Sequence, residues 1–402
     1  MVQFRPFHGY IPNIGAQEKV TDRVSPPYDV ISKEELAELQ SHPLNVANIT
    51  LGGTDGNYVD AGKRLDHWIA QGLLGKDEKE SFYLYRQTFT ENFGKVHRTG
   101  IIGILKAEGY DNNGVIPHEE TFSKVKEDRL NLLRGVETHC ESIFCLYDQL
   151  PSDLIRAMEK SARPVLEWTE KIGVTHTLAL ISDAPVVERM ITELSSKRLL
   201  IADGHHRYET SVKYAQENPA DDRKQYVLAT LVSTNDPGLI VRPTHRLLSG
   251  MEISEDDLIN RLEEFFYLRM FDHLPEMIEA LTASKETALG LWTKNERYVL
   301  LSPREMDLDD IMWSIDTFVC EKVLLDKVII PWAGKDFKIM YDHDPISVGD
   351  KIQKGEADMA VILSPPNLEA IWQVALGGRV MPKKSTYFWP KIWSGFLYYR
   401  MK

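Results

Sequence analysis

Cysteine is scarce in this chain of 402 residues, which has only Cys140, Cys145 and Cys320. A small, odd number favours a reducing compartment over a disulfide-linked scaffold. Long apolar stretches are lacking too: the chain has no run of about 18 apolar residues, the length needed to span a bilayer. The first residues do not resemble a signal peptide. We therefore expect a cytoplasmic protein with no membrane partner.

Positive charge is also in short supply. Lys and Arg number 47 against 60 Asp and Glu, which gives a net charge of -13. A protein that binds the phosphate backbone of DNA or RNA needs a basic face, so the composition argues against nucleic acid as a partner. A local basic pocket for one small anion remains compatible with this balance.

Several common motifs are missing. The sequence has no GxxxxGK[ST] loop, no GxGxxG after a strand and no GxSxG, so the usual nucleotide-binding folds and the hydrolase nucleophile turn are not indicated. His139, Cys140 and Cys145 do not have the spacing of a zinc knuckle, and no second cysteine pair exists. Packing in a core is the better interpretation of these three residues.

What the chain does have is a globular composition, with 43% hydrophobic and 27% charged residues. Its length exceeds one ordinary core, so two domains are the natural expectation. The pattern predicts a mixed α/β (α+β) fold, with regions 1–250 and 251–402, although segments could cross that boundary. Helices are predicted over 33–40, 58–74, 183–197, 205–217, 254–265 and near 308–324, strands over 81–90, 142–147, 176–181, 199–202, 225–233 and 357–363, and a loop over 236–250.

The most informative segment is IADGHHRYET, residues 201–210. A short apolar strand ends at Asp203-Gly204 and a helical pattern follows at once, which places the N–H groups of a helix start beside one carboxylate, two imidazoles and a guanidinium. This arrangement suits an anion, and phosphate above all. Arg207 could bind phosphate bidentately, and His205 or His206 could donate to it or carry a proton. The plainer alternative is a capping Asp203 with histidines in solvent.

Four further segments carry chemistry. VSPPYDV holds Asp29 in a stiff loop, as a base or metal ligand or simply in a turn before a capped helix. The loop HEET offers the carboxylates Glu119 and Glu120 as a base or Mg²⁺ ligand. The other two segments are basic: RPTHR carries His245 and Arg246, and MPKKSTYFWPK carries Lys383 and Lys384. Each suits an anionic ligand, and each could equally be an ordinary strand end or a packed C-terminal strand.

Taken in order, RPF, VSPPYDVIS, HEET with KEDRLNLLR, IADGHHRYET, PTHRLL and MPKKSTYFWPK resemble the bacterial and archaeal family known as domain of unknown function 1015. Six ordered motifs cover essentially the whole chain. The family label implies no activity.

A second resemblance covers only residues 199–214, whose strand–DGHHR–helix element is similar to the phosphate motif of the ParB/sulfiredoxin-like superfamily, which includes free serine kinases. It implies a ParB/sulfiredoxin-like core, phosphate binding by Gly204, His205, His206 and Arg207, and a role for Asp203 in the turn or at Mg²⁺. No cysteine lies in the motif, which argues against sulfinic-acid repair, and no helix-turn-helix is recognised.

The resulting hypothesis is a Mg²⁺-dependent phosphotransferase. It would move phosphate between ATP or ADP and a small hydroxyl metabolite, and free L-serine is the best single candidate for that metabolite. The base would be Glu120 or Asp29, and Asp203 and His205 complete the catalytic candidates. Asp203 and Glu119 would hold the metal, while His245, Arg246, Lys383 and Lys384 would join the nucleotide contacts. Alternatives are a CTP- or ATP-bound switch without turnover, or a metal-dependent hydrolase using His118, His205, His206 and His245. A homodimer is left open.

Overall fold

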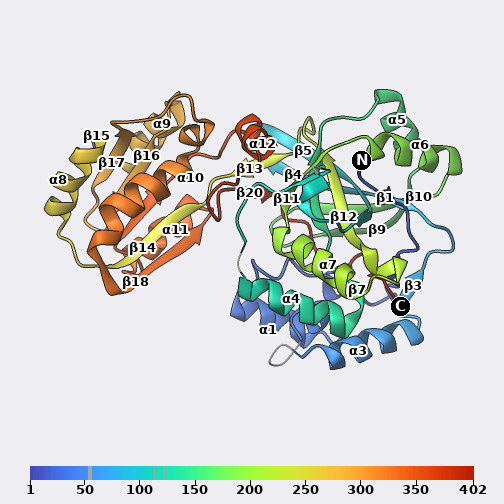
Figure 1. The fold of residues 1–402 in the computed structure, drawn as a ribbon. Coiled ribbons are helices and arrows are strands. Elements are labelled where there is room, and N and C mark those ends of the chain that lie inside the picture. Colours follow the sequence, from blue (N-terminus) through green and yellow to red (C-terminus); the bar gives the residue numbers. More distant parts are fainter. Residues whose placement is uncertain (53–56, 113, 122) are drawn as a thin grey trace. The chain divides into compact units, whose positions relative to one another are not determined.

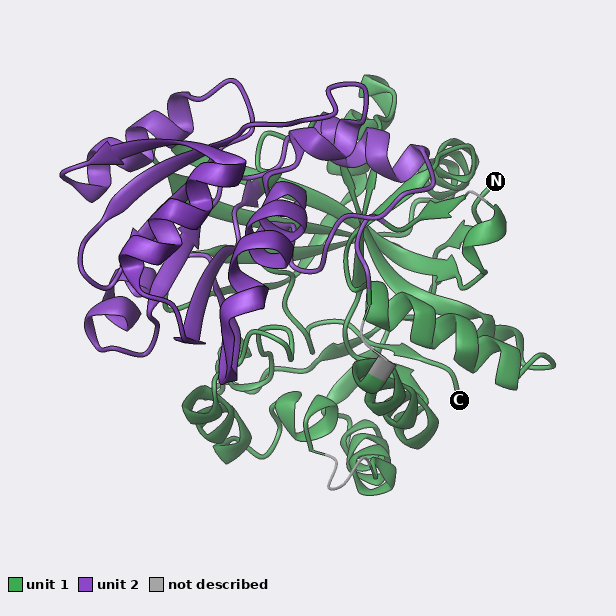
Figure 2. Ribbon diagram, turned by 60° about the vertical axis from the view of Figure 1, so that its left-hand side comes forward, with its two compact units in different colours: residues 1–117, 121–240, 390–402 green, residues 118–120, 241–389 purple. Residues whose placement is uncertain are grey.

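The computed structural model describes residues 1–52, 57–112, 114–121 and 123–402. The chain forms two compact units, drawn in different colours in Figure 2. Unit 1 comprises residues 1–117, 121–240 and 390–402, and unit 2 comprises residues 118–120 and 241–389. Three features differ from the division expected at residue 250: residues 118–120 belong to unit 2, the chain enters unit 2 about ten residues earlier, and the last thirteen residues, 390–402, belong to unit 1.

A nine-stranded mixed sheet forms the centre of unit 1, with the order β6-β11-β8-β12-β5-β4-β10-β9 and with β1 paired to β5 (Figure 1). β11 runs parallel to β6 and β8 runs parallel to β12, while the other pairs are antiparallel. Its described strands are β1 (Phe4–Arg5), β4 (Phe82–Glu91), β5 (Gly94–Lys106), β6 (Val115–Ile116), β8 (Ile143–Tyr147), β9 (Arg163–Thr169), β10 (Thr175–Ile181), β11 (Leu199–Asp203) and β12 (Tyr226–Ser233).

Two apolar clusters hold unit 1 together. The larger one joins sheet residues such as Ile143 and Ile201 to Leu154, Met190 and Tyr208 of the helices α5 (Ser152–Ser161), α6 (Ala184–Ser195) and α7 (His205–Glu217). The smaller one lies among α2 (Ala47–Thr50), α3 (Val59–Ala70) and α4 (Ser123–Val136). α4 packs on both α3 and α7, so it connects the two clusters. The remaining elements of this unit are α1 (Lys33–Ser41), η1 (Val20–Asp22), η2 (Tyr110–Asn112), η3 (Asp222–Gln225), β2 (Tyr10–Pro12), β3 (Leu74–Lys76), β7 (Thr138–His139) and β21 (Tyr399–Arg400).

Unit 2 is an α+β layered unit around a six-stranded antiparallel sheet of order β15-β17-β16-β19-β14-β18. One cluster joins sheet residues to α8 and η5, and another joins sheet residues to α9 and α11. The described elements are β14 (His245–Met251), α8 (Glu255–Phe265), β15 (Phe266–Phe271), α9 (Leu274–Ala283), β16 (Leu289–Thr293), β17 (Tyr298–Pro303), η4 (Ile311–Ser314), α10 (Asp316–Val319), η5 (Cys320–Ile329), η6 (Ile330–Trp332), β18 (Ala333–Asp342), α11 (Pro345–Gln353), β19 (Met359–Ile362) and α12 (Leu368–Leu376), with β13 (Ile240–Arg242) paired to β20 (Tyr387–Trp389).

Most long elements match the sequence-based expectation. The mixed α/β class is confirmed, the β4–β5 hairpin pairs from Tyr83 with Ile102 to Glu91 with Gly94, and α7 spans the expected residues. Ser32 caps α1 by accepting a hydrogen bond from the backbone N–H of Glu35. Among the described residues, no helix combines the length and apolarity needed to cross a bilayer.

Two expectations were wrong. The loop expected over 236–250 contains β13 and β14, and β14 is an internal strand between β18 and β19. Leu247 and Leu248 on β14 belong to different clusters, so both faces of that strand are buried, and this tertiary pairing outweighs the local turn residues. The helix expected near 308–324 is instead the short turn η4, followed by α10 and the π-helical η5.

Candidate functional site

The turn between β11 and α7 shows how the DGHHR motif folds. β11 ends at Asp203, and Gly204 has φ +91°, which lets the chain reverse into α7 without the steric cost that a side chain would impose. A Cβ at Gly204 would lie 3.1 Å from the guanidinium of Arg207. The backbone conformation therefore favours glycine here, and a side chain at this position would also have to displace the guanidinium of Arg207.

Asp203 is held by two cations. Its Oδ2 accepts a hydrogen bond from Arg207 Nη2 at 2.7 Å, and its Oδ1 accepts one from Lys391 Nζ at 2.9 Å. The exposed fractions of the three side chains are only 22% for Asp203, 12% for Arg207 and 11% for Lys391. Salt screens ion pairs in such surroundings less than it screens surface pairs, so Arg207 and Lys391 attract Asp203 more strongly than exposed cations would.

Arg207 is oriented inward. Its Nη1 donates to the carbonyl oxygen of Ser142, in addition to the bond from Nη2 to Asp203. Burial lowers the pKa of Arg207, but the carboxylates of Asp203 and Glu141 more than offset this and raise the pKa above its usual value. The guanidinium thus stays charged, and part of its donor capacity is used to hold the turn together.

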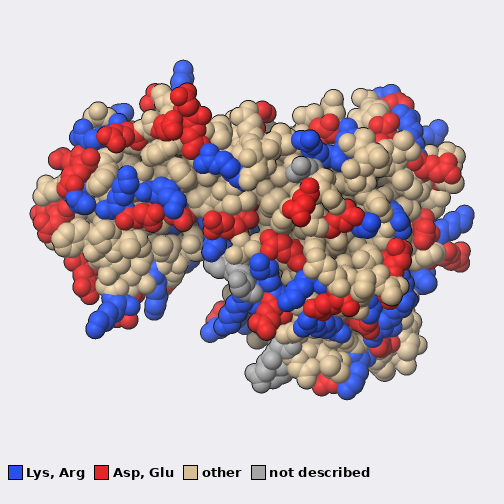
Figure 3. Space-filling model, in the orientation of Figure 1, with Lys and Arg blue, Asp and Glu red and all other residues tan. Residues whose placement is uncertain are grey.

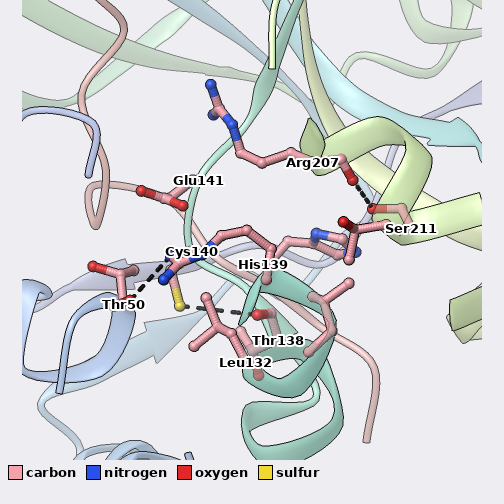
Figure 4. Close-up of a pocket in the computed structure, with 11 residues that line it drawn as sticks. Thr50, Leu132, Thr138, His139, Cys140, Glu141, Arg207 and Ser211 are labelled. Atoms are coloured by element: carbon pink, nitrogen blue, oxygen red, sulfur yellow. Dashed lines mark hydrogen bonds between the residues drawn. The ribbon is translucent and has the colours of Figure 1, made fainter. Parts of the chain in front are cut away.

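A small cavity of about 30 Å³ lies beside this cluster, within unit 1 (Figure 4). That volume suits a water molecule or two and is too small for a nucleotide. His139 Nε2 has no hydrogen-bond partner among the described residues, and burial lowers the pKa of His139 to about 4. The cavity is lined by Thr50, Arg129, Leu132, Leu133, Thr138, His139, Cys140, Glu141, Arg207, Thr210 and Ser211.

Arg129 and Glu141 supply charge to the same wall. Glu141 is 7% exposed and accepts a hydrogen bond from Ser394 Oγ at 3.1 Å. Arg129 donates to the carbonyl of Thr50 at 3.0 Å and to Tyr58 Oη at 2.9 Å. Burial lowers the pKa of Arg129, yet Glu141 and its other neighbours raise it overall. Glu141 therefore acts electrostatically on both buried arginines.

The VSPPYDV loop reaches this part of unit 1. The guanidinium of Arg129 lies 4.4 Å from the centre of the Tyr28 ring. Burial raises the pKa of Tyr28, and the charge of the neighbouring exposed residue Asp29 adds to that rise. Asp29 and the DGHHR turn thus belong to the same unit.

The two histidines of the motif differ in environment. Both belong to the first turn of α7, where a helix presents backbone N–H groups and the positive end of its dipole. His205 is 8% exposed, whereas His206 is half-buried. His206 is therefore more accessible to solvent than His205.

The other predicted residues lie in unit 2. The three residues 118–120 join that unit by pairing with the MPKKST segment: Met381 N donates to His118 O at 2.8 Å, and Lys384 N donates to Glu119 Oε1 at 2.7 Å. Lys383 Nζ lies 4.0 Å from a carboxylate oxygen of Glu120. Residues 118–120 and the MPKKST segment, more than 250 residues apart, thus form one cluster in unit 2.

His245 and Arg246 occupy the first positions of β14 and are almost fully buried. His245 Nδ1 accepts a hydrogen bond from the backbone N–H of Leu363 at 3.2 Å, and burial lowers the pKa of His245 to about 4. Arg246 donates to the backbone carbonyls of Thr244 and Lys383. Both side chains are thus engaged with the backbone of unit 2.

The predicted metal ligands Asp203 and Glu119 come from different units. No three His, Cys, Asp or Glu side chains gather into a possible metal group in the part of the chain that the structure describes. Asp203 belongs to unit 1 and Glu119 to unit 2, and the four histidines of the hydrolase hypothesis are divided in the same way. A Mg²⁺ ion carried by nucleotide phosphates needs only one or two protein carboxylates, so Asp203 still fits that mode of binding.

Three residues of the charged cluster and of the cavity wall beside it were not predicted from the sequence. Lys391 lies in the recognised MPKKSTYFWPK motif but was not singled out, and its ion pair with Asp203 depends on the return of the chain to unit 1. Glu141 was detectable as a lone carboxylate just before an apolar strand, HCESIFCLY. Arg129 lies in the charged KEDRLNLLR motif, where nothing in the local pattern indicates burial, yet it is 3% exposed.

The fold and this turn define a two-unit mixed α/β protein with a strand–glycine–helix element at a charged cluster. The chain belongs to the family described as "Protein of unknown function (DUF1015)", whose family model matches residues 4–318. This confirms the first resemblance seen in the sequence. No curated protein matches the chain.

Solved structures with similarity to the chain include three named proteins. A conserved hypothetical protein from Pyrococcus furiosus has 16% identity and a TM-score of 0.38, over 73% of this chain and 92% of that chain. A free serine kinase in complex with AMP has 16% identity and a TM-score of 0.36, over 68% of this chain and 83% of that chain. SbnI with a C-terminal truncation, from Staphylococcus aureus, has 9% identity and a TM-score of 0.36, over 72% and 84%.

Proposed function

We propose that this chain is a nucleotide-dependent phosphotransferase that moves phosphate between ATP or ADP and a small hydroxyl metabolite. The observation that carries the proposal is the Asp203–Gly204 turn, where the start of α7 lies with the guanidinium of Arg207 and the ammonium group of Lys391. A helix start and two cations suit phosphate oxygens.

Each residue at the turn would have a separate role in binding the phosphate groups. Backbone groups at Gly204 and the exposed part of His206 would contact phosphate, and Lys391 would neutralise charge on its oxygens. Asp203 would hold both cations in position and could approach Mg²⁺ carried by the nucleotide. That ion, when bound, would neutralise charge on the transferred phosphoryl group. Arg207 would keep the turn in shape through Asp203 and Ser142.

The base that accepts the hydroxyl proton is assigned to Asp29 or Glu120. Asp29 belongs to unit 1 with the DGHHR turn, while Glu120 belongs to unit 2 with Lys383. Asp29→Asn and Glu120→Gln therefore test which unit supplies the base. A base variant should lower kcat and leave nucleotide affinity nearly unchanged, because it removes an interaction of the transition state.

The test is phosphorus NMR on the purified chain with Mg²⁺ and with ATP, ADP or CTP in turn, each with and without L-serine. The choice of L-serine rests on the resemblance of the DGHHR motif. A new phosphomonoester signal that requires both nucleotide and serine supports the proposal and identifies the donor. Line broadening of the nucleotide without product would favour the nucleotide switch, and an unchanged spectrum with every nucleotide would contradict phosphate binding at the turn.

Variants connect the signal to the site. Asp203→Asn and Lys391→Met should abolish product formation or lower nucleotide affinity. Arg156→Ala, an exposed arginine on α5 in the same unit, is the matched control and should behave like the parent chain. If both site variants keep full activity, the turn is not the phosphate site.

A further inference from the structure

A second cavity in unit 1 has a charge opposite to that of the whole chain. Its volume is about 570 Å³, within the range of small-molecule sites. Five basic side chains line it, namely Arg5, Lys76, Arg223, Arg400 and Lys402, against the two carboxylates of Glu80 and Asp222. The wall therefore has an excess of three positive charges in a chain whose net charge is -13.

The basic residues come from segments that the fold holds in place. Arg5 lies on β1, which pairs with β5 in the central sheet, and Lys76 lies on β3, which pairs with β2. Arg400 lies on β21, which pairs with β7. Side chains presented by paired strands need little reorganisation to receive a ligand.

Three of the five cations, Arg223, Arg400 and Lys402, have carboxylate partners that do not line the cavity. Asp66 binds both Arg400 at 2.9 Å and Lys402 at 3.0 Å, and Asp221 binds Arg223 at 3.1 Å, but neither aspartate lines the cavity. Arg5 is paired within the wall, because its Nη1 donates to Asp222 Oδ2 at 3.4 Å. An anion in the cavity would share Arg5 with Asp222 and would add a counter-charge on the wall side of Arg223, Arg400 and Lys402.

Aromatic rings complete the wall. The guanidinium of Arg5 lies 4.6 Å from the centre of the Tyr226 ring, and Tyr399 Oη donates to the carbonyl of Arg223 at 2.6 Å. Phe7, from the RPF segment, also lines the cavity and packs edge-on against Tyr399. The combination of cations with apolar rings suits an organic anion better than a bare inorganic ion.

The cavity is separate from the DGHHR turn. Asp222 and Arg223 lie on η3, which packs against the C-terminal end of α7, where Gln225 donates to the carbonyl of Ala215. The DGHHR turn lies at the opposite end of that 13-residue helix, which is about 20 Å long. No residue of the DGHHR turn, 203–207, lines this cavity.

We propose that this cavity binds a small multivalent organic anion, a phosphate ester or a di- or tricarboxylate, independently of the phosphotransferase site. Arg5 and Lys76 are the anchoring cations to test, because both residues are exposed and their replacement should leave folding intact. The inference does not depend on the proposed function, since no residue of the turn takes part.

Isothermal titration with phenyl phosphate, inorganic phosphate and citrate at low ionic strength tests the site. The parent chain should bind phenyl phosphate or citrate at millimolar concentration or better, and the double variant Arg5→Gln/Lys76→Gln should lose about tenfold or more in affinity. Arg156→Gln/Lys160→Gln, which removes two exposed cations from α5, should bind as the parent does.

Each outcome decides the matter. Tighter binding of phenyl phosphate than of inorganic phosphate supports a phosphate ester at the aromatic wall, and preferred binding of citrate supports a carboxylate. Equal losses in the two double variants would show only general charge attraction and would overturn the proposal. So would the absence of binding with all three probes, or full binding by the Arg5→Gln/Lys76→Gln variant when its circular dichroism matches the parent.

Discussion

Lys391 donates a hydrogen bond from Nζ to Oδ1 of Asp203 at 2.9 Å, across 188 positions of sequence. The backbone at this point is fixed by the β4–β5 hairpin, because Gln87 Nε2 donates to the carbonyl of Lys391 at 2.8 Å and Arg98 donates to that of Pro390. The return of the C-terminal segment to unit 1 thus completes the charged cluster at the DGHHR turn.

Replacing Lys391 by Met should destabilise unit 1. The change removes one of the two cations on a largely buried carboxylate, and Arg207 remains to hold the other oxygen, so a loss of about 1–3 kcal/mol in unfolding free energy is expected. Urea denaturation followed by tryptophan fluorescence measures it. Lys160→Met on the exposed face of α5 is the control, and an equal, small effect of both changes would mean that the ion pair contributes no stability.

Gly204→Ala should cost more stability than Gly173→Ala. Both glycines have a left-handed backbone, with φ +91° and φ +87°, but a Cβ at Gly173 would meet nothing within 4 Å, whereas one at Gly204 would lie 3.1 Å from Arg207. The conformational cost of about 1–2 kcal/mol is common to the two, so the excess reports the clash with the guanidinium. Paired thermal melts measure the difference. Identical shifts would show that Arg207 moves aside freely.

Glu141→Gln should destabilise the chain by about 2–4 kcal/mol, because it removes the negative charge that offsets the burial of Arg129 and Arg207. Glu127→Gln, at an exposed position on α4, serves as the control. Chemical denaturation at pH 7 gives the values. A neutral or stabilising result for Glu141→Gln would mean that the two arginines do not need this carboxylate.

Asp316 in unit 2 predicts a pH dependence of stability. Burial raises the pKa of Asp316 to about 7 from an ordinary value of 3.8, although the backbone N–H of Ser364 partly opposes this. Between those values the folded chain binds more protons than the unfolded chain, so the contribution of Asp316 is present at low pH and is lost as the pH rises through about 7.

Asp316→Asn should therefore make the stability of unit 2 less dependent on pH between about 4 and 7, and should raise it relative to the parent at pH 8 by about 1–3 kcal/mol. Denaturation curves at a series of pH values provide the comparison. Asp307→Asn, at an exposed position of unit 2, should leave the profile unchanged. A parent-like profile for Asp316→Asn would contradict the assigned cause.

Charge on the surface agrees with the composition. On the face drawn in Figure 3, acidic and basic side chains are interspersed over both units. Among the described residues, basic side chains gather locally around Asp203 and around Arg5 and Lys76. Such local features fit small anions, in keeping with an excess of 13 negative charges over the chain.

The sequence alone determined the elements whose signals are local. The apolar run before Asp203, the glycine that follows and the helical spacing beyond it specify the β11–α7 turn, because strand burial, left-handed φ and helix periodicity each act over a few residues. The β4–β5 hairpin and the Ser32 cap were predictable for the same reason.

Only the tertiary structure decided which distant motifs meet. It brought Lys391 to Asp203, Arg129 and Glu141 to the wall beside Arg207, and residues 118–120 to the MPKKST segment of unit 2. It also made β14 an internal strand, although Pro243 and Gly250 flank or interrupt it locally. Long-range pairing and burial decide such contacts, and they leave no periodic signal in the segments that they join.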